Sequence, residues 1–277
     1  MEATRIGQPN QDVAGNNENK PRAVAPGIFS IPSQDNYDPK SGFVHCSIKR
    51  YMNDLYHLSF QIGDTETVAI VAKKVKSSLT SNYHIYDAIR GGLNTKLSKK
   101  AGHYIGKFRR DKDQRAGYYT LYHANREKEQ AAAFVYDIPR LVHQVTDGQP
   151  PRKMKAVVPR GNSRTGSTNS VAAVTMKTSN VTEKSRLIEH LHNGTWRHNN
   201  LLALQTKAPV FTANRYRLDF NGRVLVPSVK NIQLMNEQGE ILLQFGKVDK
   251  KGRFHLDYKA PFTAFSALGA ALAQFDL

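Results

Sequence analysis

The sequence Ile105-Gly-Lys-Phe-Arg places two cationic side chains two residues apart. Successive side chains of a β-strand point to opposite faces, so on a strand Lys107 and Arg109 share one face and Phe108 points to the other. An ammonium group is a compact point charge, and a guanidinium is a planar fork that binds phosphate through two hydrogen bonds. The pair could bind an anion, but a strand face that carries this pattern is more often simply solvated.

Other residues with reactive side chains give weaker patterns. Cys46 lies in an apolar, strand-like run, which favours a small core residue over a reactive thiol. Three histidines, His190, His192 and His198, lack an evident fourth ligand and the ordered spacing of a zinc site, so we expect no metal. We find no nucleophile elbow and no recognisable pair of carboxylates, so the sequence predicts a non-enzymatic protein with no cofactor and no catalytic residues.

The composition favours a polyanionic partner. The chain has 40 Lys and Arg against 23 Asp and Glu, a formal net charge of +17 at pH 7. Such a charge attracts nucleic acids, anionic lipids and acidic proteins, and it does not choose among them. Because we find a single cysteine, no apolar run of signal-peptide type and no transmembrane stretch, we expect a cytoplasmic protein whose membrane contact is peripheral.

The elements that must position these residues are mostly strands. Residues 1–40 are rich in Asn, Gln, Pro, Gly and Lys, which predicts a flexible polar arm before a folded domain over residues 41–277. Residues 160–180, rich in Ser, Thr, Asn and Gly, predict a surface excursion. Short runs of β-branched, aromatic or alternating residues predict strands at 43–49, 56–61, 67–72, 83–86, 104–109, 118–122, 133–136, 154–158, 216–220, 224–226, 231–234, 241–245 and 253–258.

The segment 261–275 contains no charged residue and is rich in Ala and Leu. Its leading Pro261 suits the first turn of a helix, and a helix that is apolar all round must be buried. About 15 residues are too few to cross a bilayer, which needs about 20. Many strands and one buried helix predict a mainly β fold, a closed antiparallel barrel filled by a central hydrophobic C-terminal helix.

Motifs distributed from Gly42 to Leu277 resemble those of the tubby family. They are Gly42-Phe-Val-His-Cys-Ser-Ile-Lys-Arg, Thr80-Ser-Asn-Tyr after a basic run, Arg90-Gly-Gly, Ile105-Gly-Lys-Phe-Arg, Ala132-Ala-Phe-Val-Tyr, Pro151-Arg-Lys-Met, Lys207-Ala-Pro-Val-Phe, and the tail that begins at Asn214-Arg-Tyr-Arg and ends at Phe275-Asp-Leu. The resemblance implies a twelve-stranded antiparallel barrel around a central helix, in agreement with the strands expected from the residues.

The tubby domain is known for binding phosphoinositides, above all phosphatidylinositol 4,5-bisphosphate. The resemblance therefore implies a membrane-recruitment or adaptor protein at the inner face of the plasma membrane. It also implies ciliary transport machinery or a membrane-protein cargo as partners, with the base of a cilium or flagellum and the nucleus as further locations. The alternative is a nucleic-acid-binding, transcription-linked protein, but we find no DNA-reading helix, zinc finger or RNA-binding signature.

By motif, the family's headgroup residues correspond to Asn82, Lys107, Arg109 and Lys128. Lys128 departs from the Arg of the family, so it keeps the charge and loses the planar fork. Six further lysines predict an auxiliary basic surface, and they are Lys73, Lys74, Lys76, Lys96, Lys99 and Lys100. Close to an anionic membrane, each such cation adds roughly 1 kcal/mol of attraction.

Overall fold

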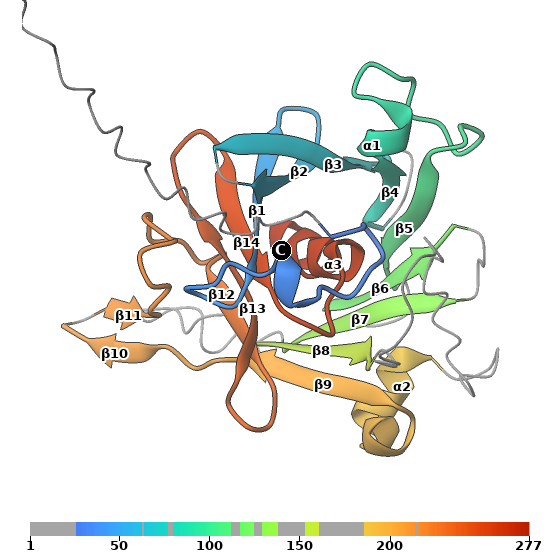
Figure 1. The fold of residues 1–277 in the computed structure, drawn as a ribbon. Helices are drawn as coiled ribbons and strands as arrows, with labels where there is room; N and C mark the ends of the chain where they lie inside the picture. Colours follow the sequence, from blue (N-terminus) through green and yellow to red (C-terminus); the bar gives the residue numbers. More distant parts are fainter. Residues whose placement is uncertain are drawn as a thin grey trace, which may run out of the picture.

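A computed structural model describes residues 26–62, 64–76, 80–111, 117–124, 129–137, 153–160, 186–213 and 215–276. Twelve strands close into an antiparallel barrel (Figure 1) with the order β1-β14-β13-β12-β9-β8-β7-β6-β5-β4-β3-β2. Their bounds are β1 Val44–Tyr51, β2 Leu55–Ile62, β3 Thr65–Lys74, β4 Asn82–Asp87, β5 Tyr104–Arg110, β6 Gly117–His123, β7 Gln130–Asp137, β8 Lys153–Pro159, β9 Leu201–Thr206, β12 Ile232–Met235, β13 Ile241–Lys247 and β14 Arg253–Tyr258. The predicted mainly β, twelve-stranded closed barrel is confirmed.

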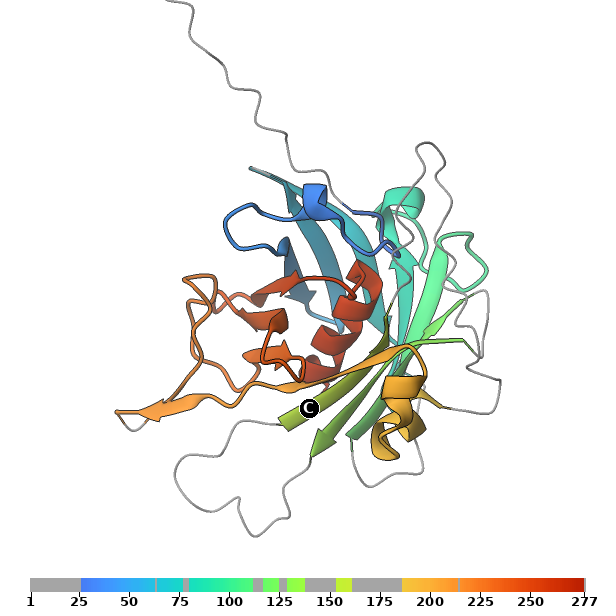
Figure 2. The same cartoon turned by 60° about the horizontal axis from the view of Figure 1, so that its bottom comes forward.

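The helix α3 (Ala264–Phe275) runs through the barrel (Figures 1 and 2), and all of its residues are buried. It begins three residues after Pro261, because Thr263 is the N-cap, and its hydroxyl accepts a hydrogen bond from the Ser266 amide at 3.2 Å. A Thr oxygen satisfies an amide that the first turn leaves unpaired. The buried apolar helix was predicted correctly, and its start at Pro261 was wrong.

The segment before β1 packs against the barrel from residue 26 onward. The Ile28 side chain is buried, and its carbonyl accepts a hydrogen bond from the Phe265 amide at 3.1 Å. The rings of Phe29 and Phe265 lie 5.1 Å apart. Residues 26–40, which the sequence predicts to be part of a flexible arm, therefore contribute to the fold, and residues 1–25 lie outside the described residues.

Other elements differ from those predicted. Residues 224–226 form no strand, and Val224 packs over Gly246 of β13. The strands β9 and β10 (Val210–Thr212) and the helices α1 (Ala88–Gly91) and α2 (Leu187–His192) were not predicted. β10 pairs with β11 (Arg215–Arg217) in a hairpin that projects from the barrel (Figure 1). The excursion predicted over residues 161–180 lies outside the described residues.

Candidate anion-binding site

The neighbouring strands β4 and β5 bring three of the predicted site residues together. Asn82 lies directly opposite Arg109 in the antiparallel register. Lys107 is two residues from Arg109 on the same strand, so its side chain shares that face. Side chains directly opposite have Cβ atoms about 4.5–5.5 Å apart, which is close enough to contact one phosphorylated ring. Lys128 lies outside the described residues.

The opposite face of these two strands is anchored in the core. Tyr83 and Phe108 are opposite each other and buried, with ring centroids 5.9 Å apart. Gly106 leaves room for α3, because a Cβ on it would collide with the Phe265 ring and with the carbonyl of Tyr122. Packing against the helix therefore fixes the backbone from which Lys107 and Arg109 project outward.

Lys107 and Arg109 have no carboxylate partner in the part of the chain that the structure describes. Lys107 is half-buried, and its ammonium lies 5.3 Å from the ring centroid of Tyr122, while Arg109 is exposed. An unpaired cation beside an aromatic ring keeps its charge available for an incoming anion. Both side chains are thus accessible to a phosphate.

Two polar atoms at the start of β4 are buried without a hydrogen-bond partner, Asn82 Oδ1 in the strand and Thr80 Oγ1 two residues before it. Leaving a buried acceptor unsatisfied costs about 1–3 kcal/mol. The amide NH₂ of the Asn82 side chain can donate to a phosphate oxygen.

His84 shares the outward face, and the sequence reading missed it. It lies directly opposite Lys73 of β3 and directly opposite Lys107 of β5. Burial lowers the pKa of His84, and the charges of Lys99 and Lys107 lower it further. The alternation that starts at Asn82 was the available signal, because residues 82 and 84 of a strand point the same way.

Five of the six predicted auxiliary lysines are exposed, namely Lys73, Lys76, Lys96, Lys99 and Lys100. Because the charge of Lys99 lowers the pKa of His84, the loop before β5 brings positive charge to the same face. Lys74 is different, since it lies opposite the buried Tyr83, and its ammonium contacts the Asp276 carboxylate at 2.9 Å. Lys74 therefore holds the end of α3 and does not extend the outer basic surface.

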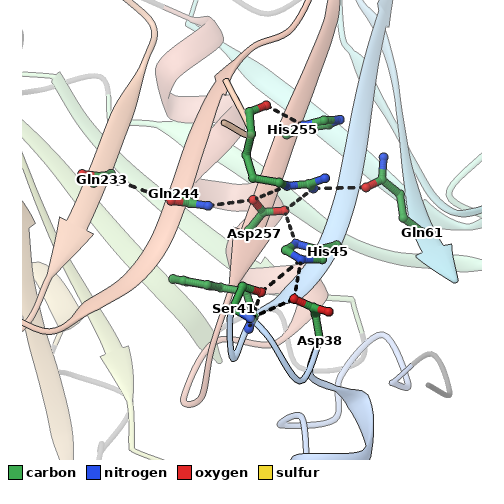
Figure 3. Close-up of polar contacts among 10 residues, drawn as sticks. Asp38, Ser41, His45, Gln61, Gln233, Gln244, His255 and Asp257 are labelled. Carbon is green, nitrogen blue, oxygen red and sulfur yellow. Dashed lines mark hydrogen bonds and ion pairs between the residues drawn. The ribbon is translucent and has the colours of Figure 1, made fainter. Parts of the chain in front are cut away.

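A second polar cluster connects β1, β14 and the segment that precedes β12 (Figure 3). The buried carboxylate of Asp257 accepts hydrogen bonds from His45 Nδ1 at 2.9 Å and from Gln244 Nε2 at 2.8 Å. Arg223 donates to the same carboxylate from Nη2 at 2.6 Å and from Nε at 3.0 Å. Ser41 Oγ lies 3.1 Å from His45 Nε2.

The distances among Ser41, His45 and Asp257 match those of a nucleophile, a general base and the carboxylate that orients the base. Acyl transfer also needs amide groups that stabilise an oxyanion. The amides of Ser41 and Gly42 instead donate to Asp38, to its carboxylate at 2.8 Å and to its carbonyl at 2.8 Å. We therefore assign this cluster a structural role, that of holding the segment before β1 against β14.

The remaining candidates are Cys46 and the three histidines. Cys46 is fully buried, and burial raises the pKa of its thiol well above the usual value, which confirms it as a core residue. Among the described residues, no group of three or more His, Cys, Asp or Glu side chains is arranged to hold a metal ion. Within those same residues, no helix has the length and apolarity to cross a membrane.

Comparison with known proteins assigns the chain to a family. The family model described as Tub family matches residues 35–277. Tubby protein homolog 1 of Caenorhabditis briggsae is 28% identical over 83% of this chain and 56% of its own length. Human Tubby-related protein 3 is 29% identical over 86% of this chain and 54% of its own length. Human Tubby-related protein 1 is 30% identical over 86% of this chain and 44% of its own length. The chain thus spans about half the length of these curated relatives. It belongs to the Tub family.

Proposed function

We propose that this protein binds phosphoinositides, with phosphatidylinositol 4,5-bisphosphate preferred, and is recruited by them to the cytoplasmic leaflet of a membrane. The observation that carries the proposal is the shared outward face of Asn82, Lys107 and Arg109. These three correspond by motif to headgroup-binding residues of the family to which the chain belongs.

The chemistry of the three side chains suits a ring with two adjacent phosphates. Arg109 can bind one phosphate through two hydrogen bonds, and Lys107 supplies a point charge to the neighbouring one. Asn82 can contact a phosphate or a ring hydroxyl and so orient the ring. The formal net charge of +17 adds a long-range attraction that raises the rate of encounter with an anionic membrane.

We extend the proposal to a non-enzymatic adaptor that carries a membrane-protein cargo at the plasma membrane or at the base of a cilium. This part rests on family membership alone. The chain spans about half the length of its curated relatives, so the proposal concerns the barrel domain. The bound headgroup would determine which membrane the protein binds, and the cargo would bind elsewhere on the protein.

Vesicle binding tests the lipid site. The full chain is mixed at physiological salt with vesicles that each carry one phosphoinositide isomer, beside the double variant Lys107→Ala/Arg109→Ala. Hydrogen bonds to charged groups contribute about 1.5–3 kcal/mol each, so the variant should lose at least about tenfold in affinity for the preferred isomer. The control is Lys250→Ala/Lys251→Ala, which removes two exposed lysines from the β13–β14 turn.

Loss of isomer-selective binding in the first variant, with binding kept in the control, is the expected result. Equal losses in both variants, with no preference among isomers, would reject the headgroup site and indicate a diffuse attraction. Binding to nucleic acid with a steep dependence on salt would then be the alternative to pursue.

A further inference from the structure

The outward face of β3, β4 and β5 carries a row of three nitrogen-bearing side chains. Lys73 lies opposite His84, and His84 lies opposite Lys107. Neighbouring strands are about 4.8 Å apart, so His84 occupies the centre of the row within reach of the groups on either side. The row adjoins Asn82 and Arg109, which are the next residues along β4 and β5 on that face.

We propose that His84 is a further ligand of the headgroup site, and that it takes up a proton when it binds a phosphomonoester of the inositol ring. The inference rests on the function proposed above. It adds a fourth described residue to that site and makes binding depend on pH.

The surroundings of His84 explain why it would be neutral without a ligand. Lys73 and Lys107 face it from the two neighbouring strands, and Lys99 faces it from the loop before β5. The ring of Tyr104 lies 5.6 Å away at an interplanar angle of 77°. Like charges directly opposite each other destabilise a sheet, so a permanent cation at residue 84 would destabilise the free protein.

A bound phosphate reverses this balance. A phosphomonoester carries about −1.5 to −2 charges near neutral pH, which outweighs the repulsion from a neighbouring lysine and favours the imidazolium. Both ring nitrogens of an imidazolium donate hydrogen bonds, so the protonated His84 can contact a phosphate that Lys73 or Lys107 also contacts. Binding and protonation are therefore coupled, and each strengthens the other.

The test compares wild-type protein with His84→Gln across about pH 5.5 to 8, using vesicles of the preferred isomer and soluble inositol 1,4,5-trisphosphate. The phosphates titrate in this range as well. The quantity of interest for each ligand is therefore the affinity of wild-type protein divided by that of His84→Gln at the same pH. The ratio should rise about tenfold from pH 8 to pH 6, because one unit of pKa change corresponds to tenfold in affinity. Direct titration of the His84 imidazole by NMR, with and without the trisphosphate, should give a higher pKa in the complex.

The outcomes separate the two proposals. Selective binding with a constant affinity ratio, and an imidazole whose titration the trisphosphate does not change, would overturn the role of His84 and leave the headgroup site intact. Failure of both probes to bind would overturn both proposals. A pH effect on vesicles alone, without one on the soluble trisphosphate, would assign the proton uptake to the membrane surface and also reject the role of His84.

Discussion

The carboxamide of Asn82 contains a polar atom that the fold itself does not use. Its Oδ1 is buried without a partner, so Asn82→Ala removes an unsatisfied group. We predict that the free energy of unfolding does not fall and rises by at most about 1–3 kcal/mol, while affinity for phosphoinositide vesicles falls about tenfold. Urea denaturation and vesicle binding measure the two effects.

Asn236 provides the matched control for that prediction. It lies in the β12–β13 turn, where its Oδ1 accepts hydrogen bonds from the amides of Gln238 at 3.0 Å and Glu240 at 2.9 Å. Asn236→Ala should therefore destabilise the fold by about 1–3 kcal/mol and leave vesicle binding unchanged. A loss of stability in Asn82→Ala as large as that in the control would make Asn82 a structural residue.

The carboxylate of Asp257 makes the free energy of unfolding depend on pH. Burial alone raises the pKa of Asp257, but hydrogen bonds from His45 and Arg223 and the Arg223 charge outweigh it, so the pKa is lowered from 3.8. A lowered pKa means that the carboxylate contributes stability above about pH 4 and loses it as the pH falls further. Asp257→Asn should cost about 3 kcal/mol at pH 7, and the difference from wild type should shrink below about pH 4.

Urea denaturation of both proteins between pH 3 and pH 7 measures this difference. A difference that is constant down to pH 3 would mean that the ion pair with Arg223 does not act through the ionised carboxylate. The unpaired Arg223 is the main source of the expected cost, because removing one partner leaves the other charge partly buried.

The neighbouring residues Lys73 and Lys74 show how far the sequence predicts the site, because one is exposed and the other contacts Asp276. The alternation on β5 was sufficient to predict that Lys107 and Arg109 share a face. The basic run was predicted as a single surface, yet Lys74 turns inward to Asp276. That contact joins residues 202 positions apart in the chain, so only the closed barrel determines it.

At the scale of elements, Gly106 links the helix to the binding strand. An added Cβ would collide with the backbone carbonyl of Tyr122 in β6 and with the Phe265 ring of α3, and neither group can easily move. Overpacking typically costs about 1–3 kcal/mol, so Gly106→Ala should destabilise the fold by that amount and weaken vesicle binding by displacing β5. Thermal unfolding and vesicle binding are the measurements.

Gly102 is the matched control for Gly106. It lies in the loop before β5, and an added Cβ there meets no atom within 4 Å. Gly102→Ala should therefore change the free energy of unfolding by less than about 0.5 kcal/mol. If Gly106→Ala changed the free energy of unfolding as little as Gly102→Ala, close packing of α3 against β5 would not be what fixes the position of the site.

The elements that sequence reading predicted are those with a clear local pattern. The apolar α3 and strands such as β1 and β5 show burial or alternation within their own residues. β9 does not, because its sequence Leu-Leu-Ala-Leu-Gln-Thr is rich in residues that favour helices, and its pairing with β8 and β12 overrides that preference. Residues 224–226 show the reverse case, an apolar run that forms no strand, in which Val224 packs over Gly246 and Leu225 is exposed.

At the scale of the whole molecule, charge adds attraction that is not specific for one lipid. The loop lysines Lys96, Lys99 and Lys100 are exposed. Changing all three to Gln should weaken binding to mixed anionic vesicles several-fold at low salt, because each cation near the surface contributes about 1 kcal/mol at most. The order of preference among phosphoinositide isomers should not change.

A variant with Lys40, Lys250 and Lys251 changed to Gln removes the same charge beside β1 and β14, away from the loop in the barrel order. It should bind more tightly than the loop variant. Equal binding by the two variants, measured by vesicle sedimentation at two salt concentrations, would mean that net charge alone matters and that the loop has no particular role.

In the proposed function, one outward face of β4 and β5 binds the headgroup. The most direct test is to follow the backbone amide NMR signals of the full chain during titration with inositol 1,4,5-trisphosphate. Saturable shifts that are largest at residues 82–84 and 107–109 are the expected result. Shifts spread over the basic surface without saturation, or centred on another part of the barrel, would contradict it.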